Sequence, residues 1–218
     1  MRKISEKTPQ LRQRLLLHDQ EFLNRGFTSL AGVDEAGRGP LAGPVVASAV
    51  IVRDVSFLTR VDDSKKMSGL ARNKACDEIL AKCEVGIGVV EHDEIDAINI
   101  LQASLKAMRE AVSKLPEMPG CLLIDGNRSP ALPLRQFEVV DGDSKSFAIA
   151  CASIVAKVIR DRMMEHYDEI YPQYGFKRHK GYGTGEHLAA LKKYGACKIH
   201  RRSFDPVKQL DYGNASHH

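Results

Sequence analysis

The stretch that decides the fold spans residues 31–52 and reads AGVDEAGRGPLAGPVVASAVIV. Two apolar runs flank an adjacent pair of acids, Asp34 and Glu35, and the glycine-rich piece that follows carries Arg38. Neighbouring side chains on a regular strand point to opposite faces, so two adjacent carboxylates converge only where the strand ends and the backbone turns. Glycines permit that turn because they adopt positive φ and let another backbone come close. The stretch therefore predicts carboxylates at a strand end, with a solvated acid pair in a hairpin loop as the open alternative.

The composition is that of a folded chain without a membrane segment. Of the 218 residues, 43% are hydrophobic and 28% are charged, which is enough apolar material for a core. No apolar run approaches the roughly 20 residues that a membrane span needs, and the N-terminus has no signal-peptide shape. The five cysteines are scattered without a Cys-x-x-Cys pair, which favours reduced thiols over a disulfide framework or a zinc site. We therefore expect a cytoplasmic protein that makes no contact with a membrane.

Apolar patterning along the chain predicts a mixed α/β fold. We expect five strands, over residues 28–35, 44–52, 84–90, 121–125 and 137–140. We expect helices after N-caps and along apolar stripes, over residues 69–83, 98–115, 143–167 and 186–194. Residues 1–27 are expected to form a polar helical lead-in to which we assign no chemistry. This order of elements predicts a mixed five-stranded sheet flanked by helices.

Two further acids stand at positions where chemistry is expected. Asp125 ends an apolar run and is followed by Gly126, which repeats the arrangement of the first acid pair. Ligand sites gather at strand ends in open α/β sheets, so Asp125 is a candidate, although a turn Asp that only caps a loop has the same appearance. Asp143 lies 18 residues further on, where Asp143 or Ser144 is expected to cap a long helix. Helix capping alone explains an acid at position 143.

The segment over residues 172–203 is strongly basic. It holds eight Lys or Arg residues against one acid, Glu186, and aromatic residues are interleaved with the cations. Cations with aromatics suit a nucleic-acid backbone and its stacked bases or sugars. An ordinary solvated charged face fits the same composition equally well.

Five motifs in order resemble type 2 ribonuclease H, the ribonuclease HII family. They are AGVDEAGRGP, DSKK, LIDGN, GDSKS with the following ASIVAKVIRD, and HKGYGT, and they span residues 30–206. Each motif is weak alone, and the ordered set is specific; Cys151, where the family commonly has a small residue, is a departure away from the site. The resemblance implies a ribonuclease H-like fold divided into a lead-in (1–27), a catalytic core (28–170), a basic substrate-binding segment (171–210) and a disordered tail (211–218).

The resemblance also implies the site. Two divalent ions, Mg²⁺ or Mn²⁺, are expected on Asp34, Glu35, Asp125 and Asp143, since hard cations prefer carboxylate oxygens and clustered carboxylates repel one another without them. The backbone of Gly37, Arg38 and Gly39 is expected to sense a 2′-hydroxyl, and Tyr182 to stack on the sugar of the next deoxynucleotide. Phosphate contacts are expected from Lys65, Lys66 and Lys180, and Ser64 is expected to bind substrate.

The implied reaction is cleavage 5′ of a ribonucleotide in an RNA/DNA hybrid or in ribonucleotide-containing duplex DNA, leaving 3′-hydroxyl and 5′-phosphate ends. The implied role is removal of misincorporated ribonucleotides and RNA primers, and we expect a monomer. One competing interpretation is a non-catalytic nucleic-acid binder that uses the basic segment alone and needs no metal. A second is a metal-dependent phosphatase acting on small phosphate esters. The set of acids argues against the binder, and the basic aromatic segment argues against the phosphatase.

Overall fold

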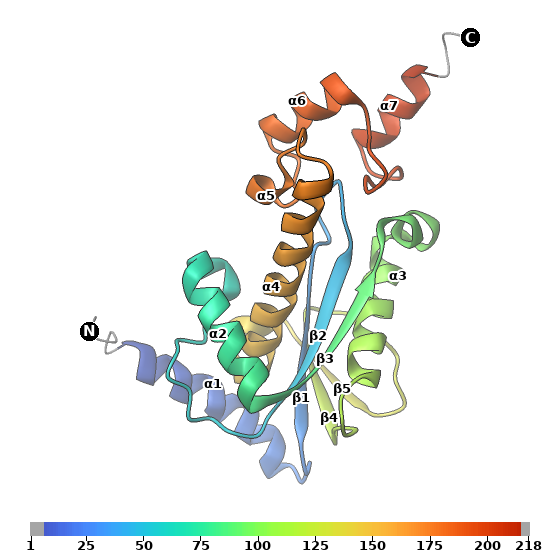
Figure 1. Cartoon of the computed structure of the whole chain (residues 1–218). Helices are drawn as coiled ribbons and strands as arrows, with labels where there is room; N and C mark the ends of the chain where they lie inside the picture. Colours follow the sequence, from blue (N-terminus) through green and yellow to red (C-terminus); the bar gives the residue numbers. More distant parts are fainter. Residues whose placement is uncertain (1–6, 215–218) are drawn as a thin grey trace.

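A single mixed sheet forms the centre of the computed structural model, which describes residues 7–214 and the side chains of residues 10–210. Its strands lie in the order β3-β2-β1-β4-β5 (Figure 1). Their bounds are β1 (Leu30–Ala36), β2 (Val45–Val52), β3 (Cys83–Val90), β4 (Cys121–Asp125) and β5 (Arg135–Val139). β2 pairs antiparallel with β1 and β3, whereas β4 pairs parallel with β1 and β5. The predicted mixed five-stranded α/β fold is therefore confirmed.

Helices cover both faces of this sheet (Figure 1). They are α1 (Lys7–Asn24), α2 (Gly69–Lys82), α3 (His92–Ser113), α4 (Phe147–Ile170), α5 (Phe176–His179), α6 (Gly185–Tyr194) and α7 (Val207–Asn214), with short 3-10 turns η1 (Ser64–Lys66) and η2 (Gly142–Ser144). None of the helices within residues 7–214 combines the length and apolar content of a membrane span.

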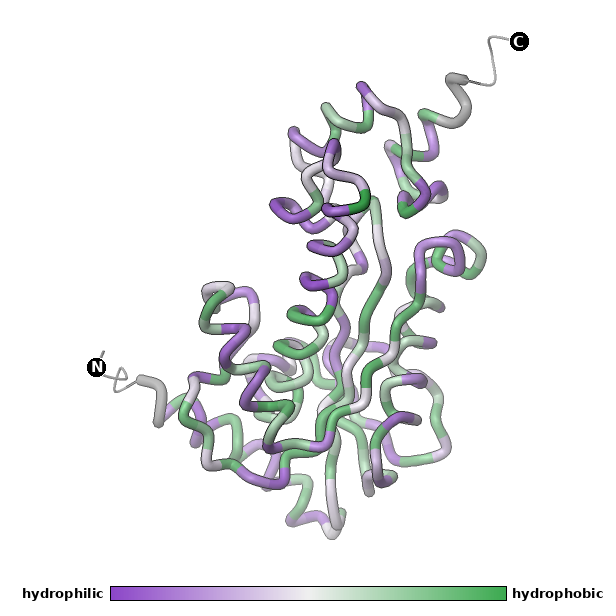
Figure 2. Tube along the Cα trace, in the orientation of Figure 1, coloured by the Kyte–Doolittle hydropathy of each residue, from purple (hydrophilic) through white to green (hydrophobic). Residues whose placement is uncertain are grey.

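The two faces carry separate apolar cores. Side chains of α3 pack on one face of β1 and β2, and α4 packs on the other together with α1 and α2. Figure 2 shows hydrophobic residues gathered along the strands, with hydrophilic residues on the outer turns of the helices. α4 lies close to β1 because Gly32 has no Cβ, and a Cβ there would overlap the Ala148 backbone. The absence of a side chain at Gly32 therefore allows the close approach of α4 to the sheet.

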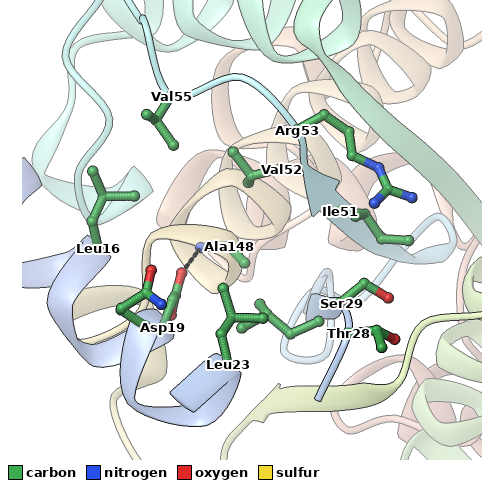
Figure 3. A pocket seen from close by; sticks show the side chains of 12 residues that line it. Leu16, Asp19, Leu23, Thr28, Ser29, Ile51, Val52, Arg53, Val55 and Ala148 are labelled. Carbon is green, nitrogen blue, oxygen red and sulfur yellow. Dashed lines mark hydrogen bonds between the residues drawn. The ribbon is translucent and has the colours of Figure 1, made fainter. Parts of the chain in front are cut away.

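The start of α4 differs from the expectation. Asp143 and Ser144, predicted as helix caps, belong to η2, and the cap is Ser146, whose Oγ accepts a hydrogen bond from Ile149 N. A carboxylate supports the same helix end, since Asp19 of α1 accepts a bond from Ala148 N at 2.9 Å (Figure 3). Two acceptors thus serve the first turn of α4, and Asp143 is released from capping.

A cavity of about 280 Å³ lies beside this contact, at the end of the sheet where β1 begins and β2 ends. Leu16, Ile51 and Val52 give it apolar walls, and among the described lining residues Asp19 is its only acid (Figure 3). Because one carboxylate does not make a hydrolytic site, we assign no catalysis to this cavity.

Several element ends lie away from their predicted positions. α3 begins at His92 and is kinked at Asn99, where φ is 66° and Oδ1 accepts bonds from Leu101 N and Gln102 N. The apolar stripe therefore predicted only the part of this helix that follows the kink. α7 continues to Asn214, inside the segment predicted to be disordered from residue 211. Residues 1–6 and 215–218 of the predicted lead-in and tail lie outside the described residues.

The basic C-terminal segment packs against the loop that joins β1 to β2. Leu41 and Ala42 of this loop share an apolar cluster with Phe176 of α5 and Leu191 of α6. Backbone bonds join the same parts, since Leu41 N donates to Gly181 O at 2.8 Å and Gly43 N donates to Ile199 O at 2.9 Å. The glycine-rich loop after the first acid pair is therefore enclosed by residues from the far end of the chain.

Candidate active site

Asp34 and Asp125 lie at the same edge of the sheet because β1 and β4 are parallel. The register places Val33 opposite Ile124, so the next residues along the two strands are the two acids. Asp34 is buried, and its Oδ1 accepts a bond of 2.7 Å from the amide of Glu35. The strand-end geometry predicted for these acids is thus present in the fold.

The acids share one electrostatic environment. The pKa of Asp34 is raised well above its ordinary value, first by burial and then by the charges of Glu35 and Asp125. Burial also raises the pKa of Glu35; the cation of Arg38, 3.3 Å away, opposes this rise, and Asp125 adds to it. Three carboxylates in such proximity disfavour simultaneous ionisation unless a cation offsets their charge.

Asp143 joins this group from η2. Burial raises its pKa most, with Asp63 and Asp125 adding to the rise, whereas Lys65 lowers it from a distance of 3.9 Å between Nζ and Oδ2. The turn that carries Asp143 is attached to the first acids through Asp125, whose Oδ1 accepts a bond of 2.6 Å from Gly142 N. The charge of Asp143 therefore interacts with that of Asp125, and Lys65 forms an ion pair with Asp143.

One cavity of about 260 Å³ gathers most of the predicted site residues. Its lining includes Asp34, Glu35, Gly37, Arg38, Gly39, Ser64, Lys65, Asp125 and Tyr182. Three predicted residues lie outside this lining. Asp143 faces Lys65, Lys66 pairs with Asp63 at 3.1 Å, and Lys180 pairs with Glu165 at 2.7 Å.

Two polar residues without a predicted role also line the cavity. Ser153 and Lys157 project from α4 at a spacing of four, which places them on one face of the helix. Ser153 Oγ lies 2.9 Å from Ser64 Oγ, and Lys157 Nζ lies 2.6 Å from Asp161 Oδ1. Their signal was available in the motif ASIVAKVIRD, because the same face leads back to the acids once the helix is placed on the sheet.

Two fully buried arginines hold the glycine loop. Arg201 donates from Nη2 to Gly37 O at 2.6 Å, from Nη1 to Arg38 O at 3.0 Å and from Nε to Gly43 O at 3.0 Å. Arg160 donates from Nε to Pro44 O at 2.9 Å and from Nη2 to Ala42 O at 3.1 Å. Arg201 belongs to the basic segment, yet its guanidinium faces backbone carbonyls rather than solvent. Composition alone gave no signal for this role.

The site suits a hard divalent cation by the chemistry of its donors. Within the described residues, no group of three or more His, Cys, Asp or Glu side chains is arranged to hold a metal ion. In this structure Glu35 pairs with Arg38 and Asp143 pairs with Lys65. Both cations are largely exposed, at 54% and 81% of their side-chain surface, so they can turn away without disturbing the core. As hard oxygen donors, the carboxylates of this site fit a divalent cation by their chemistry.

Comparison with known sequences gives a consistent family. A family model described as Ribonuclease HII matches residues 31–207. A protein named Ribonuclease HII from Acetivibrio thermocellus is 51% identical over 191 residues, which are 87% of this chain and 75% of the relative. Another Ribonuclease HII, from Syntrophobacter fumaroxidans, is 53% identical over 195 residues, which are 88% of this chain and 84% of the relative.

Solved structures agree with the fold. The crystal structure of the ribonuclease H2 from Pyrococcus horikoshii OT3 matches with a TM-score of 0.70 at 25% identity, covering 85% of this chain and 98% of that one. The structure of Bst-RNase HIII in complex with Mn²⁺ shares the fold with a TM-score of 0.63 at 17% identity, covering 84% and 69% of the two chains. The predicted ribonuclease H-like fold is confirmed. From its sequence relatives and its fold, this chain belongs to the ribonuclease HII family and is an endonuclease of the ribonuclease H type.

Proposed function

We propose that the chain is a metal-dependent endoribonuclease that cleaves the RNA strand of RNA/DNA hybrids and cuts 5′ of single ribonucleotides in duplex DNA. One observation carries the proposal: Asp34, Glu35 and Asp125 line the same cavity as the Gly37–Gly39 backbone and Tyr182. Carboxylates that can bind cations therefore line the same cavity as a backbone loop and an aromatic ring that can contact a sugar.

The four acids are assigned the metal-binding role. Asp34, Glu35 and Asp125 hold the ions, and Asp143 joins them when Lys65 moves to a phosphate. When bound, two divalent ions lower the pKa of the attacking water and stabilise the charge on the leaving oxygen. The carboxylates supply hard oxygen donors, and a bound cation relieves the repulsion that raises the pKa of Asp34. Mg²⁺ and Mn²⁺ both accept such ligands, and the structure of Bst-RNase HIII with Mn²⁺ provides a precedent in the same fold.

Selection of a ribonucleotide is assigned to the glycine loop. Arg201 occupies the carbonyls of Gly37 and Arg38. In the described structure, the amides of Arg38 and Gly39 have no backbone or side-chain acceptor. A 2′-hydroxyl accepts as well as donates, so it can meet these amides, and a deoxyribose cannot. The loop therefore offers donors at fixed positions beside the acids.

Tyr182 is assigned to a sugar of the substrate, and the exposed lysines are assigned to its phosphates. Tyr182 is 44% exposed, and its ring lies against Gly39, where a Cβ added to the glycine would be 3.7 Å from Cε1. One face of the ring is thus available for stacking on a sugar. Lys65 and Lys66 are exposed and lie next to the cavity, where they suit phosphates; Lys180 reaches them only by leaving Glu165. We assign residues 171–210 to substrate binding, and we expect a monomer.

The proposed biological role is removal of misincorporated ribonucleotides and RNA primers in the cytoplasm. Hydrolysis with departure of the 3′ oxygen leaves a 3′-hydroxyl and a 5′-phosphate, which suit polymerase extension and ligation. The competing phosphatase interpretation predicts turnover of small phosphate esters without need of a duplex.

The test is a nicking assay on a DNA duplex that carries one ribonucleotide, with Mg²⁺ and Mn²⁺ in turn. We expect a single cut 5′ of the ribonucleotide and no cut in the all-DNA duplex. Asp34→Asn should lower cleavage by at least about 100-fold while circular dichroism stays unchanged. The matched control is Asp77→Asn on α2, where the side chain is 65% exposed. Full activity of Asp34→Asn, or metal-independent cleavage, contradicts the proposal.

A further inference from the structure

Three buried histidines lie behind Tyr182. His179 ends α5, His187 lies in α6, and His200 lies in the loop that follows α6 (Figure 1). Their residues are 8%, 0% and 1% exposed. The rings of His179 and His187 stack with centroids 4.5 Å apart, and those of His187 and His200 are 5.2 Å apart. None of the three lines the cavity of the acids, so the proposed chemistry leaves them without a role.

The hydrogen bonds fix the tautomers of two of these rings. The amide of Cys197 donates to His200 Nδ1 at 2.9 Å, and because an amide only donates, this nitrogen carries no proton. The proton of neutral His200 is therefore on Nε2, which lies 3.0 Å from His187 Nε2. His187 must accept there, so its own proton is on Nδ1 and is donated to Tyr182 O at 2.9 Å. The bonds run in one direction, from Cys197 through both rings to Tyr182.

This chain of bonds meets the backbone of Tyr182 from one side while His179 holds the other. The amide of Tyr182 donates to His179 O at 2.9 Å. The ring of His179 is itself fixed, since Nδ1 accepts from Gly181 N at 3.2 Å and Nε2 faces Tyr174 O at 2.8 Å. The Tyr182 carbonyl also accepts from Thr184 N at 2.8 Å, so His187 supplies the side-chain bond and Thr184 the backbone bond on this side of the residue.

Two rival roles do not fit this geometry. A metal ion cannot lie between His187 and His200, because their Nε2 atoms already face each other at hydrogen-bond distance. A proton relay to the reaction is excluded as well, because the chain of bonds ends on a backbone carbonyl, which has no proton to release. A proton added to either ring would set two N–H groups against each other. In agreement, burial lowers the pKa of His187 to about 4 and that of His200 to about 3.

We propose that His187 and His200 are positioning residues for Tyr182: their directional pair of neutral rings fixes the Tyr182 backbone so that its ring stays against Gly39, ready to stack on a sugar. The inference rests on the proposed function for the role of the Tyr182 ring. It assigns to buried residues of the C-terminal segment an effect on which substrate is cut, although neither ring touches the substrate.

The first test is a double-mutant cycle on the duplex with one ribonucleotide. His187→Phe keeps an aromatic ring in the stack and removes both hydrogen bonds. We expect a loss of about tenfold in kcat/KM when Tyr182 is present and less than about twofold in the Tyr182→Ala background, because the ring to be positioned is gone. Equal losses in both backgrounds indicate a general structural role and overturn the inference. The inference is also overturned if Tyr182→Ala leaves kcat/KM on this duplex unchanged.

A matched pair of variants separates the bond to Tyr182 from simple packing. The side-chain amide of Asn places its nitrogen near the Nδ1 position of histidine, whereas that of Gln reaches the Nε2 position. We therefore expect His187→Asn to keep cleavage within about threefold of the wild type and His187→Gln to lose about tenfold. The reverse order contradicts the assignment. Thermal unfolding of each variant shows that the comparison is made between folded proteins.

The second readout does not depend on activity. Nitrogen-15 spectra of the wild type at pH 7 should show His187 with its proton on Nδ1 and His200 with its proton on Nε2. The opposite tautomer, or a charged ring, at either position overturns the inference. Failure of the proposed function appears differently, as absence of metal-dependent cleavage by the wild type while the tautomers remain as stated.

Discussion

Arg160 and Arg201 donate to the same acceptor, the carbonyl oxygen of Pro44, at 2.9 Å from Nε and 3.2 Å from Nη2. Both side chains are fully buried, and within the described residues each donates its hydrogen bonds to backbone carbonyls. Burial lowers the pKa of Arg160 to about 10 and that of Arg201 to about 9, so both stay charged at neutral pH. Two cations thus converge on backbone dipoles, and this holds the loop after Asp34 and Glu35 in one conformation.

Replacing Arg201 with Lys should release that loop. One ammonium cannot reach the separate carbonyls that the guanidinium bonds, so buried acceptors lose charged donors. We expect a loss of about 2–4 kcal/mol in the free energy of unfolding, measured by denaturant titration. Arg178→Lys is the control, because that side chain is 67% exposed, and its stability should stay at the wild-type value. If Arg201→Lys has the same free energy of unfolding as the wild type, the loop carbonyls have found other hydrogen-bond donors.

Replacing Gly37 with Ala should damage the site more than the fold. Gly37 has φ of 101°, and a Cβ there would overlap Arg160 Nε. The variant has to move either the loop or the guanidinium, at a cost of about 1–3 kcal/mol, and we expect at least about tenfold slower nicking. Gly69→Ala is the matched control, because nothing lies within 4 Å of its Cβ position. Equal behaviour of the two variants would remove the loop from the site.

Binding of divalent metal should stabilise the wild type through the acid cluster. Without metal, the charges of Glu35 and Asp125 oppose ionisation of Asp34, so Asp34→Asn should unfold at a higher temperature than the wild type. Added Mg²⁺ or Mn²⁺ should raise the melting temperature of the wild type and leave that of Asp34→Asn nearly unchanged. Calorimetry with each metal gives the comparison. Equal metal-induced shifts in both proteins would place the ions elsewhere.

Acid should destabilise the fold through the buried histidines. Unfolded histidine has a pKa near its ordinary 6.5, whereas folded His187 and His200 titrate at about 4 and about 3. Between these values the unfolded chain binds more protons, so stability is fully present above pH 6.5 and falls as the pH drops towards 4. From these two rings alone we expect a loss of about 5 kcal/mol between pH 7 and pH 4.5.

The contribution of the pair is isolated by comparison of variants. His187→Phe removes one titrating group, so its stability should fall less steeply over the same pH range. His166→Gln is the control, because His166 is 68% exposed and should leave the slope as it is in the wild type. An unchanged slope in His187→Phe would assign the acid effect to other groups.

The sequence predicted the strands best where a run of apolar residues meets a clear stop. β4 has the predicted ends because an apolar run closes on Asp125 and Gly126. β5 begins two residues before the prediction, since Arg135 and Gln136 are polar residues on an edge strand and give no apolar signal. Capping residues are ambiguous in the same way, because Asp143, Ser144 and Ser146 are all acceptable caps and tertiary contacts decide among them.

Site residues were predictable where the signal is local in the sequence, and were not predictable where their partners are distant in the chain. The acids at strand ends were predictable because strand ends are visible in the sequence. The pairing of Lys65 with Asp143 was not, because it depends on where η1 and η2 meet after folding. Arg201 was the least predictable, since a cation within a basic run gives no sign that its partners are carbonyls of a loop near the other end of the chain.

The contact between Arg201 and the glycine loop can form only after residue 201 has been synthesised. Synthesis proceeds from the N-terminus, so the glycine loop leaves the ribosome long before the guanidinium that contacts Arg38 O from 163 positions further along. All four acids and Arg160 have emerged by then, yet the carbonyls of Gly37 and Arg38 have no guanidinium donor until residue 201 has been added. We expect products that stop before residue 201 to cleave nucleic acid more slowly than the longer chain, because the Gly37 and Arg38 carbonyls lack these donors.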